Sequence, residues 1–212
     1  MRIGFIDLET TGLPQQPSYD VYYPYTQLKR YTNARIIQIA LIVYDVDEKN
    51  ETKLVSEHDY VVKPDGFEIK NSHIHGIKQS EAEFVGINFI DAVNKLSKDL
   101  ESCDTLVAHN ILFDRNVFLS ELYRYGQNDL IYKINSMNYF CTSKGCTEVT
   151  KIRFNAREYK QPKLKELYKF LFKEEPVGLH NALHDTRAMI KCFFEMLKRG
   201  ILKKQDGEFY AD

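Results

Sequence analysis

The sequence predicts an α/β or α+β layered domain with helices packed against one sheet. Three strand-like segments lie within the first 63 residues, and helix-like and strand-like segments alternate after residue 88. The three early strands are joined too closely for helical crossovers. We therefore expect at least this part of the sheet to be antiparallel.

Apolar periodicity places each element along the chain. Strands are expected at residues 2–8, 35–45, 53–63 and 105–108, and helices at 88–101, 111–124, 163–172 and 182–198. Residues 13–34 are rich in Pro and Tyr and show no period, so we expect an inserted loop. We expect residues 1–200 to form one domain that includes this loop, and residues 201–212 to form a polar tail.

Composition is ordinary for a globular protein, with 43% hydrophobic and 28% charged residues. The formal net charge is −1, so a surface for nucleic acid must be a local patch. The four cysteines are scattered, which favours reduced thiols. No signal peptide or apolar stretch of membrane-spanning length is evident, so we expect a soluble intracellular protein, cytoplasmic or nuclear, without a membrane partner.

The first strand ends in two carboxylates, Asp7 and Glu9. Side chains two apart on a strand share a face, so this pair continues the apolar row of Ile3 and Phe5. Adjacent carboxylates resist ionising together unless a cation lies between them, and hard divalent ions accept such oxygen ligands. The alternative is a solvated strand end.

A second acidic segment, TLVAHNILFDRNVF, joins a strand to a helix. Asn110 is expected to cap that helix and Asp114 follows in its first turn. Helical spacing places Asp114 with Val117 and Phe118, which face the core, and a carboxylate there is costly unless it is paired or bound to metal. Attraction to the helix dipole is the alternative explanation. His109 is expected to be structural.

The third segment is GLHNALHDTRAMIKCFFEML. Asn181 is expected to cap the last helix, and Asp185 lies in its first turn on the face of the apolar Met189 row. His180 precedes the cap, where its ring can swing back over the helix start, whereas His184 points about 100° away around the helix from Asp185. Together the three segments place four acidic groups at strand ends and helix starts, on faces expected to be buried.

At these residues the chain resembles the DnaQ-like exonucleases of the DEDDh type, within the ribonuclease H-like superfamily. The motifs FIDLETTGL, AHNILFDRNVF and HNALHD occur in the family's order, and the tyrosine variant of the family would have Tyr where this chain has Asn181. Residues 63–77 (KPDGFEIKNSHIHGI) are similar to a segment of bacterial proofreading subunits. The insertion at 13–34 is longer than the loop of compact members. The resemblance implies a mixed sheet, with the first three strands antiparallel and a later strand parallel, flanked by helices.

The resemblance also implies a metal-dependent 3′→5′ exonuclease that releases nucleoside 5′-monophosphates. Asp7, Glu9 and Asp185 would hold one divalent ion, Mg²⁺ or Mn²⁺. Asp7 and Asp114 would hold a second, and His180 would act as general base.

Four further positions match substrate contacts of the family or lie near them: Thr10, Leu13, His75 and Asn110. Leu13 matches an apolar residue that packs on the terminal base, although a buried loop leucine is the alternative. Backbone groups near Thr10 match the site for the 3′-hydroxyl. The family histidine at His75 is structural or lies near the cleft.

Two segments could handle the nucleic acid. Residues 144–169 carry eight basic and three acidic residues, which suits the phosphates of a single strand, although a solvated helical face would look the same. Tyrosines of the insertion could stack on unpaired bases or pack the loop onto the domain: Tyr19, Tyr22, Tyr23, Tyr25 and Tyr31.

The preferred hypothesis is a proofreading or repair exonuclease that acts on the 3′ end of single-stranded DNA. The rival is an RNA exonuclease similar to oligoribonuclease, since only the treatment of the 2′-hydroxyl separates the two. An inactive nucleic-acid-binding scaffold is the alternative of another class, and retention of all five catalytic positions argues against it. A polymerase partner is an expectation for a free-standing proofreading domain.

Overall fold

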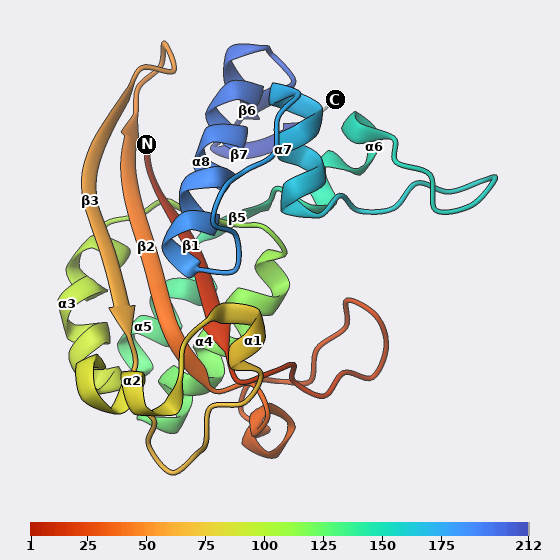
Figure 1. Cartoon of the computed structure of the whole chain (residues 1–212). Coiled ribbons are helices and arrows are strands. Elements are labelled where there is room, and N and C mark those ends of the chain that lie inside the picture. The colour runs from red at the N-terminus through yellow and green to blue at the C-terminus, as the bar shows by residue number, and fades with distance from the viewer. Residues whose placement is uncertain (212) are drawn as a thin grey trace.

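A five-stranded sheet runs through the centre of the molecule, and helices cover both of its faces (Figure 1). The computed structural model describes residues 1–211. In spatial order the strands are β3 (Thr52–Val61), β2 (Ile36–Val46), β1 (Arg2–Thr10), β4 (Thr105–Ala108) and β5 (Asn138–Cys141). The first three strands pair antiparallel, whereas β4 is parallel to β1 and β5 to β4. The predicted α/β fold with a mixed sheet is confirmed.

The helices are α1 (Ser72–His75), α2 (Gln79–Val85), α3 (Phe89–Glu101), α4 (Ile111–Arg124), α5 (Asn128–Ser136), α6 (Thr147–Thr150), α7 (Leu164–Phe172) and α8 (Ala182–Lys198). Two short 3₁₀ turns, η1 (Leu28–Tyr31) and η2 (Lys144–Cys146), complete the helical segments of the described chain. The predicted strands and the four long predicted helices occur within a few residues of their expected bounds. The sequence did not predict β5 or α5.

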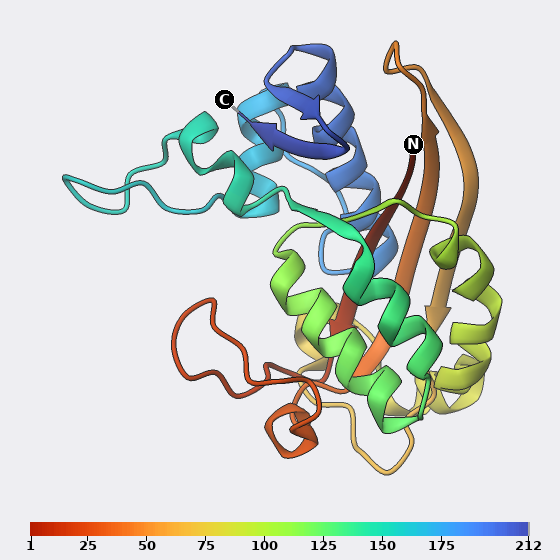
Figure 2. The same ribbon diagram turned by 180° about the vertical axis from the view of Figure 1, so that it is seen from behind.

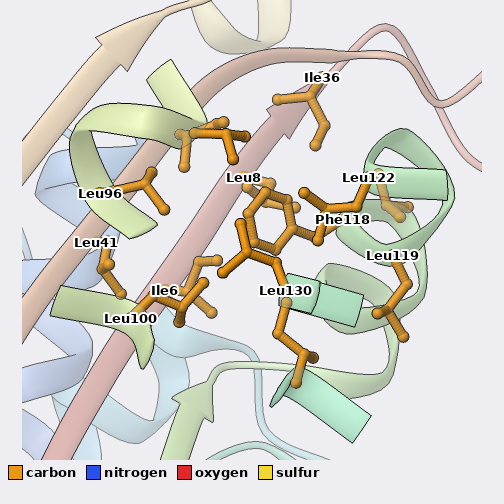
Figure 3. Close-up of a cluster of buried hydrophobic side chains, with 14 of the residues drawn as sticks. Ile6, Leu8, Ile36, Leu41, Leu96, Leu100, Phe118, Leu119, Leu122 and Leu130 are labelled. Atoms are coloured by element: carbon orange, nitrogen blue, oxygen red, sulfur yellow. The ribbon is translucent and has the colours of Figure 1, made fainter. Parts of the chain in front are cut away.

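Alternating side chains of β1 belong to two separate hydrophobic cores, one on each face of the sheet. Ile6 and Leu8 pack on one face of the sheet against α3, α4 and α5 (Figure 3). Ile3 and Phe5 belong to the core on the other face, beneath α7 and α8. Because successive strand residues point to opposite faces, Asp7 and Glu9 follow Phe5 toward the α8 side.

Helix α8 is fixed on the sheet by aromatic packing. Phe193 contacts Phe5 edge-on, with ring centroids 5.1 Å apart, and both side chains are fully buried. Met189 and Leu197, the predicted inward row of this helix, are buried in the same core. Burial of these apolar side chains, each contributing about 1.5–3 kcal/mol, therefore sets the direction in which Asp185 points.

The insertion at residues 13–34 folds back against α4. Tyr31 is fully buried, and Tyr25 packs edge-on against Tyr123. At its end Arg35 forms a buried ion pair with Glu121, 2.7 Å between Nε and Oε1. Seen from behind, the insertion and the loop between α6 and α7 project from the same side of the molecule (Figure 2).

The last residues form a hairpin of β6 (Leu202–Gln205) and β7 (Glu208–Ala211). This segment was expected to be a polar tail, yet Leu202 is buried and the ring of Phe209 lies 4.9 Å from that of Phe193. The hairpin thus extends the core beneath α8. Within residues 1–211, no helix is long and apolar enough to cross a membrane.

Candidate active site

Asp7 and Glu9 lie at the end of β1, and Asp114 of α4 is bonded to the same strand end. Strand β4 pairs with β1 only from Ile3 to Phe5, so the β4-side edge of β1 is not paired with β4 beyond that point. The backbone N–H of Leu8 donates instead to Asp114 Oδ1 at 3.1 Å. Asp114, in the first turn of α4, is thereby held at the residue between Asp7 and Glu9.

Helix α8 brings the fourth carboxylate to the same place. Asn181 caps the helix by accepting the N–H of His184, as predicted, and Asp185 follows in the first turn. One oxygen each from Asp7, Glu9 and Asp185 lies within 4.8 Å of the other two. The predicted convergence of the three acidic segments is therefore present in the fold.

Burial and mutual repulsion raise the pKa of these carboxyl groups. Burial raises the pKa of Asp7 well above its usual value, and the charges of Asp114, Asp185 and Glu9 raise it further. Burial, with a contribution from Asp185, raises the pKa of Glu9 to about 7. The pKa values of Asp114 and Asp185 are also raised by burial, against the lowering effect of the N–H groups that they accept. The cluster therefore resists full ionisation without added positive charge.

This donor set fits a hard divalent cation. Its oxygen atoms come from carboxylates, the ligands that Mg²⁺ and Mn²⁺ accept. Asp185 Oδ1 is buried and has no hydrogen-bond partner among the described residues. A buried carboxylate oxygen without a partner is costly, and metal coordination would satisfy it.

His180 lies on the loop that enters α8. Its backbone N–H donates to Asp185 Oδ2 at 3.2 Å, which places the residue beside the carboxylates, and it is exposed. The loop is held by His184, whose Nδ1 donates to the Gly178 carbonyl at 3.1 Å. Gly178 has φ +75°, and an added Cβ would lie 2.5 Å from His184 Nδ1, so only glycine fits there.

Gln38 is a site residue that the sequence analysis missed. It is buried on β2, paired in register with Glu9. Its Oε1 accepts the N–H of Ala182 at 3.2 Å, and its Nε2 donates to Asp59 Oδ1 at 2.7 Å. Gln38 therefore ties the start of α8 to the strand beside Glu9. An isolated polar residue in the apolar run of residues 35–45 was the one available signal.

The four predicted substrate contacts lie in different settings. Leu13 is 73% exposed, which rules out the buried-leucine alternative. The Thr10 hydroxyl donates to the Gly12 carbonyl at 2.7 Å. His75 is buried and both ring nitrogens are engaged, Nε2 by the Lys70 carbonyl and Nδ1 by a backbone N–H, so neither is free for a ligand.

Asn110 differs from its predicted role. It occupies the cap position of α4, but its backbone is left-handed with φ 88° and its side chain makes no capping bond. The side chain instead lies beside Tyr22 of the insertion, whose pKa burial raises to about 12. The charges of Asp20 and Asp114 also raise the pKa of Tyr22. The sequence did not predict this contact.

His109 is structural, as predicted. Its Nδ1 lies 2.9 Å from Thr142 Oγ1, and its Nε2 lies 3.0 Å from the Pro162 carbonyl. Burial lowers the pKa of His109 to about 4, so the ring is neutral at physiological pH.

Substitution of Gln38 tests how the cluster is held together. Gln38→Leu keeps the side-chain volume but removes the acceptor for the Ala182 N–H. We expect Mn²⁺ affinity, measured by calorimetry, to fall about 10-fold, because α8 is no longer fixed beside Glu9. The free energy of unfolding should fall by about 1–3 kcal/mol.

The matched control is Gln205→Leu, at an exposed glutamine of β6, which should leave affinity and stability unchanged. Mn²⁺ affinity equal to that of the unchanged protein in Gln38→Leu would contradict this role of Gln38.

Comparison with known proteins finds a family and a fold. The model of the RNase T family, described as exonuclease, matches residues 5–193. No curated protein sequence matches the chain. Among solved structures, Escherichia coli exonuclease I in complex with a dA16 oligonucleotide has 18% identity and a TM-score of 0.68, covering 93% of this chain and 41% of that one.

Two further structures have the same fold. Cell-death related nuclease 4 has 16% identity and a TM-score of 0.65, covering 94% of this chain and 64% of that one. A 3′-exonuclease studied for 3′-end specific recognition of a histone mRNA stem-loop has 13% identity and a TM-score of 0.59, covering 100% of this chain and 70% of that one.

This chain spans about 40% of the length of exonuclease I. The matched region contains all four carboxylates and His180. The chain belongs to the RNase T exonuclease family, which is DnaQ-like of the DEDDh type and lies within the ribonuclease H-like superfamily.

Proposed function

We propose that this protein is a divalent-metal-dependent 3′→5′ exonuclease that releases nucleoside 5′-monophosphates from the end of a nucleic acid. The observation that supports this most is the clustering of Asp7, Glu9 and Asp185 within 4.8 Å, with Asp114 bonded to the strand between the first two. Four carboxylates with raised pKa values have little structural benefit unless they bind cations.

Asp7, Glu9, Asp114 and Asp185 would hold two divalent ions, Mg²⁺ or Mn²⁺. When bound, such ions would stabilise the negative charge that develops in an in-line phosphoryl displacement and would lower the pKa of the attacking water. The hydrogen bond from Leu8 to Asp114 and that from His180 to Asp185 fix the two outer carboxylates on their respective helices. The chain therefore contributes a ligand set whose members are oriented before substrate arrives.

His180 would act as the general base. Its backbone is anchored to Asp185 while the residue stays exposed, so its ring can reach a water at the edge of the cluster. The imidazole takes the proton from this water, whose oxygen forms a bond to the terminal phosphorus. The bond from phosphorus to the 3′-oxygen of the preceding nucleotide breaks, so the phosphate stays on the released nucleotide and the 3′-oxygen takes a proton from solvent to become the new 3′-hydroxyl.

Residues around the end of β1 would hold the terminal nucleotide. Leu13 is exposed and apolar, which suits contact with the terminal base, and backbone groups near Thr10 would contact the 3′-hydroxyl. The further prediction that residues 1–200 form the exonuclease domain, with 13–34 as its insertion, is part of this proposal.

DNA is the proposed substrate, in a proofreading or repair role with a polymerase as partner. Residues 63–77 resemble the corresponding segment of proofreading subunits, and exonuclease I was solved with a dA16 oligonucleotide. RNA is the second candidate, since a 3′-exonuclease of the same fold recognises a histone mRNA stem-loop. An inactive scaffold is the least supported alternative because the four carboxylates and His180 lie together.

The decisive assay uses DNA and RNA oligonucleotides labelled at either end, incubated with Mg²⁺, Mn²⁺ or EDTA. We expect 3′-labelled mononucleotide to appear first and 5′-labelled strands to shorten stepwise, because the cluster acts on the terminal phosphodiester. EDTA or Asp7→Asn should abolish the reaction, since each removes cation binding.

Asp206→Asn is the matched control, because Asp206 and Glu208 repeat the spacing of Asp7 and Glu9 in the C-terminal hairpin. It should leave the rate unchanged. Activity that persists in EDTA, or release that begins at the 5′ end, would rule out the proposed function.

Substitution of His180 separates the base from the ligands. His180→Gln should lower kcat by about 10²–10⁴-fold, since proton transfer from the attacking water loses its acceptor. Mn²⁺ affinity measured by calorimetry should stay within error of the unchanged protein. His73→Gln, at an exposed histidine of α1, is the control. A collapse of Mn²⁺ affinity in His180→Gln would show that the residue is a ligand instead.

A further inference from the structure

A cavity of about 710 Å³ lies between the insertion at 13–34 and the loop at 151–163 that joins α6 to α7. It is lined by Tyr19 of the insertion, by Phe154 and Tyr159 of the second loop, and by His109 and Asn110 next to the start of α4. Both loops project from the same side of the molecule (Figures 1 and 2). The volume is within the range of about 300–1,000 Å³ that is common for ligand sites.

Two exposed aromatic rings from distant parts of the chain line this cavity. Tyr19 is 81% exposed and Phe154 is 72% exposed. They contrast with Tyr25 and Tyr31 of the same insertion, which pack against the domain. Exposed rings from two loops around one cavity offer flat apolar surfaces on which an aromatic ligand can stack.

The charge of the cavity favours an anionic ligand. Lys160 and Lys163 line it, and no Asp or Glu is among the described residues of its lining. Lys160 is paired with Glu166 at 2.5 Å, whereas Lys163 forms no ion pair with a described residue. Aromatic rings beside a cation that forms no ion pair are typical of sites for unpaired nucleic-acid strands.

The walls of the cavity are held in place before any ligand arrives. Gln161 Nε2 donates to Asp20 Oδ2 at 3.3 Å, which joins the two loops. The Phe154 N–H donates to the Glu158 carbonyl at 3.0 Å, so Phe154 lies in a closed turn. The His109 ring contacts the Pro162 carbonyl at 3.0 Å and fixes the end of the second loop. Such preorganisation lowers the entropic cost of binding.

The cavity adjoins the carboxylate cluster. Asn110, in its lining, stands four residues before Asp114, which corresponds to roughly 6 Å of helical rise. A strand with its end at the cluster therefore has the cavity within reach of its neighbouring nucleotides.

We propose that this cavity binds an unpaired base close to the 3′ end, stacked between Tyr19 and Phe154, with its phosphate near Lys163. The inference rests on the proposed nuclease function and assigns to the insertion the selection of single-stranded ends. A paired base is stacked within its duplex and cannot enter between two rings.

Binding is tested with single-stranded DNA and RNA oligonucleotides that carry 2-aminopurine near the 3′ end, with Ca²⁺ in place of Mg²⁺. Tyr19→Leu and Phe154→Leu remove one ring each from exposed positions, where folding should be unaffected. Each should weaken binding by at least about fivefold and reduce the quenching of 2-aminopurine that stacking causes. Tyr132→Leu, at a 79% exposed tyrosine of α5 outside the cavity, should change neither value.

Hydrolysis of a nitrophenyl ester of a nucleoside monophosphate, which lacks the neighbouring nucleotide, is measured in parallel. We expect both variants to hydrolyse it at the rate of the unchanged protein while their KM for the oligonucleotide rises. Equal oligonucleotide binding in the unchanged protein and both variants would overturn the base site. Ring-dependent binding without hydrolysis of either substrate would support the base site and overturn the nuclease instead.

Discussion

Mutual repulsion among four carboxylates is the constraint around which this fold is organised. Asp7, Glu9, Asp114 and Asp185 meet where burial and neighbouring charges raise the pKa of each. Without other constraints, these carboxylates would move apart and become hydrated. They stay together because packing elsewhere determines where their elements lie: Phe193 of α8 against Phe5, and the buried face of α4 against the other side of the sheet.

The sheet topology explains how two helices on opposite faces reach one point. Asp7 and Glu9 face α8, so Asp185 approaches them directly. Helix α4 lies on the other face, but β4 is short and leaves the edge of β1 accessible beyond Phe5. Asp114 accepts a hydrogen bond from the backbone N–H of Leu8 there. A longer β4 would have occupied this position with its own backbone hydrogen bonds to β1. The position of β1 between β2 and β4 therefore makes the end of this strand the meeting place of the cluster.

Local sequence patterns predicted which carboxylates form the cluster, whereas the residues that hold them in place depend on contacts between distant parts of the chain. Alternation along β1 and helical spacing around Asp114 and Asp185 are visible within a few residues of each. Gln38 could not be recognised in the same way, because its partner Ala182 is 144 residues away. Asn110 was expected to cap α4 through its side chain, but the left-handed backbone directs it to Tyr22. Residues 201–211 look polar in sequence. Leu202 and Phe209 become buried only because they pack against side chains of α8 and β5, which lie far away along the chain.

The most direct measurement is the free energy of unfolding as a function of pH, in EDTA and with Mn²⁺. Because the pKa of Glu9 rises from 4.5 to about 7 on folding, the folded protein without metal binds more protons between these values, and its stability should fall as the pH rises from about 4.5 to 7. Mn²⁺ should restore stability at pH 7. In the Glu9→Gln protein, both the loss of stability with rising pH and the stabilisation by Mn²⁺ should be much smaller. A stability profile that is the same in EDTA and Mn²⁺, and unchanged by Glu9→Gln, would contradict the view that the four carboxylates form a cation site.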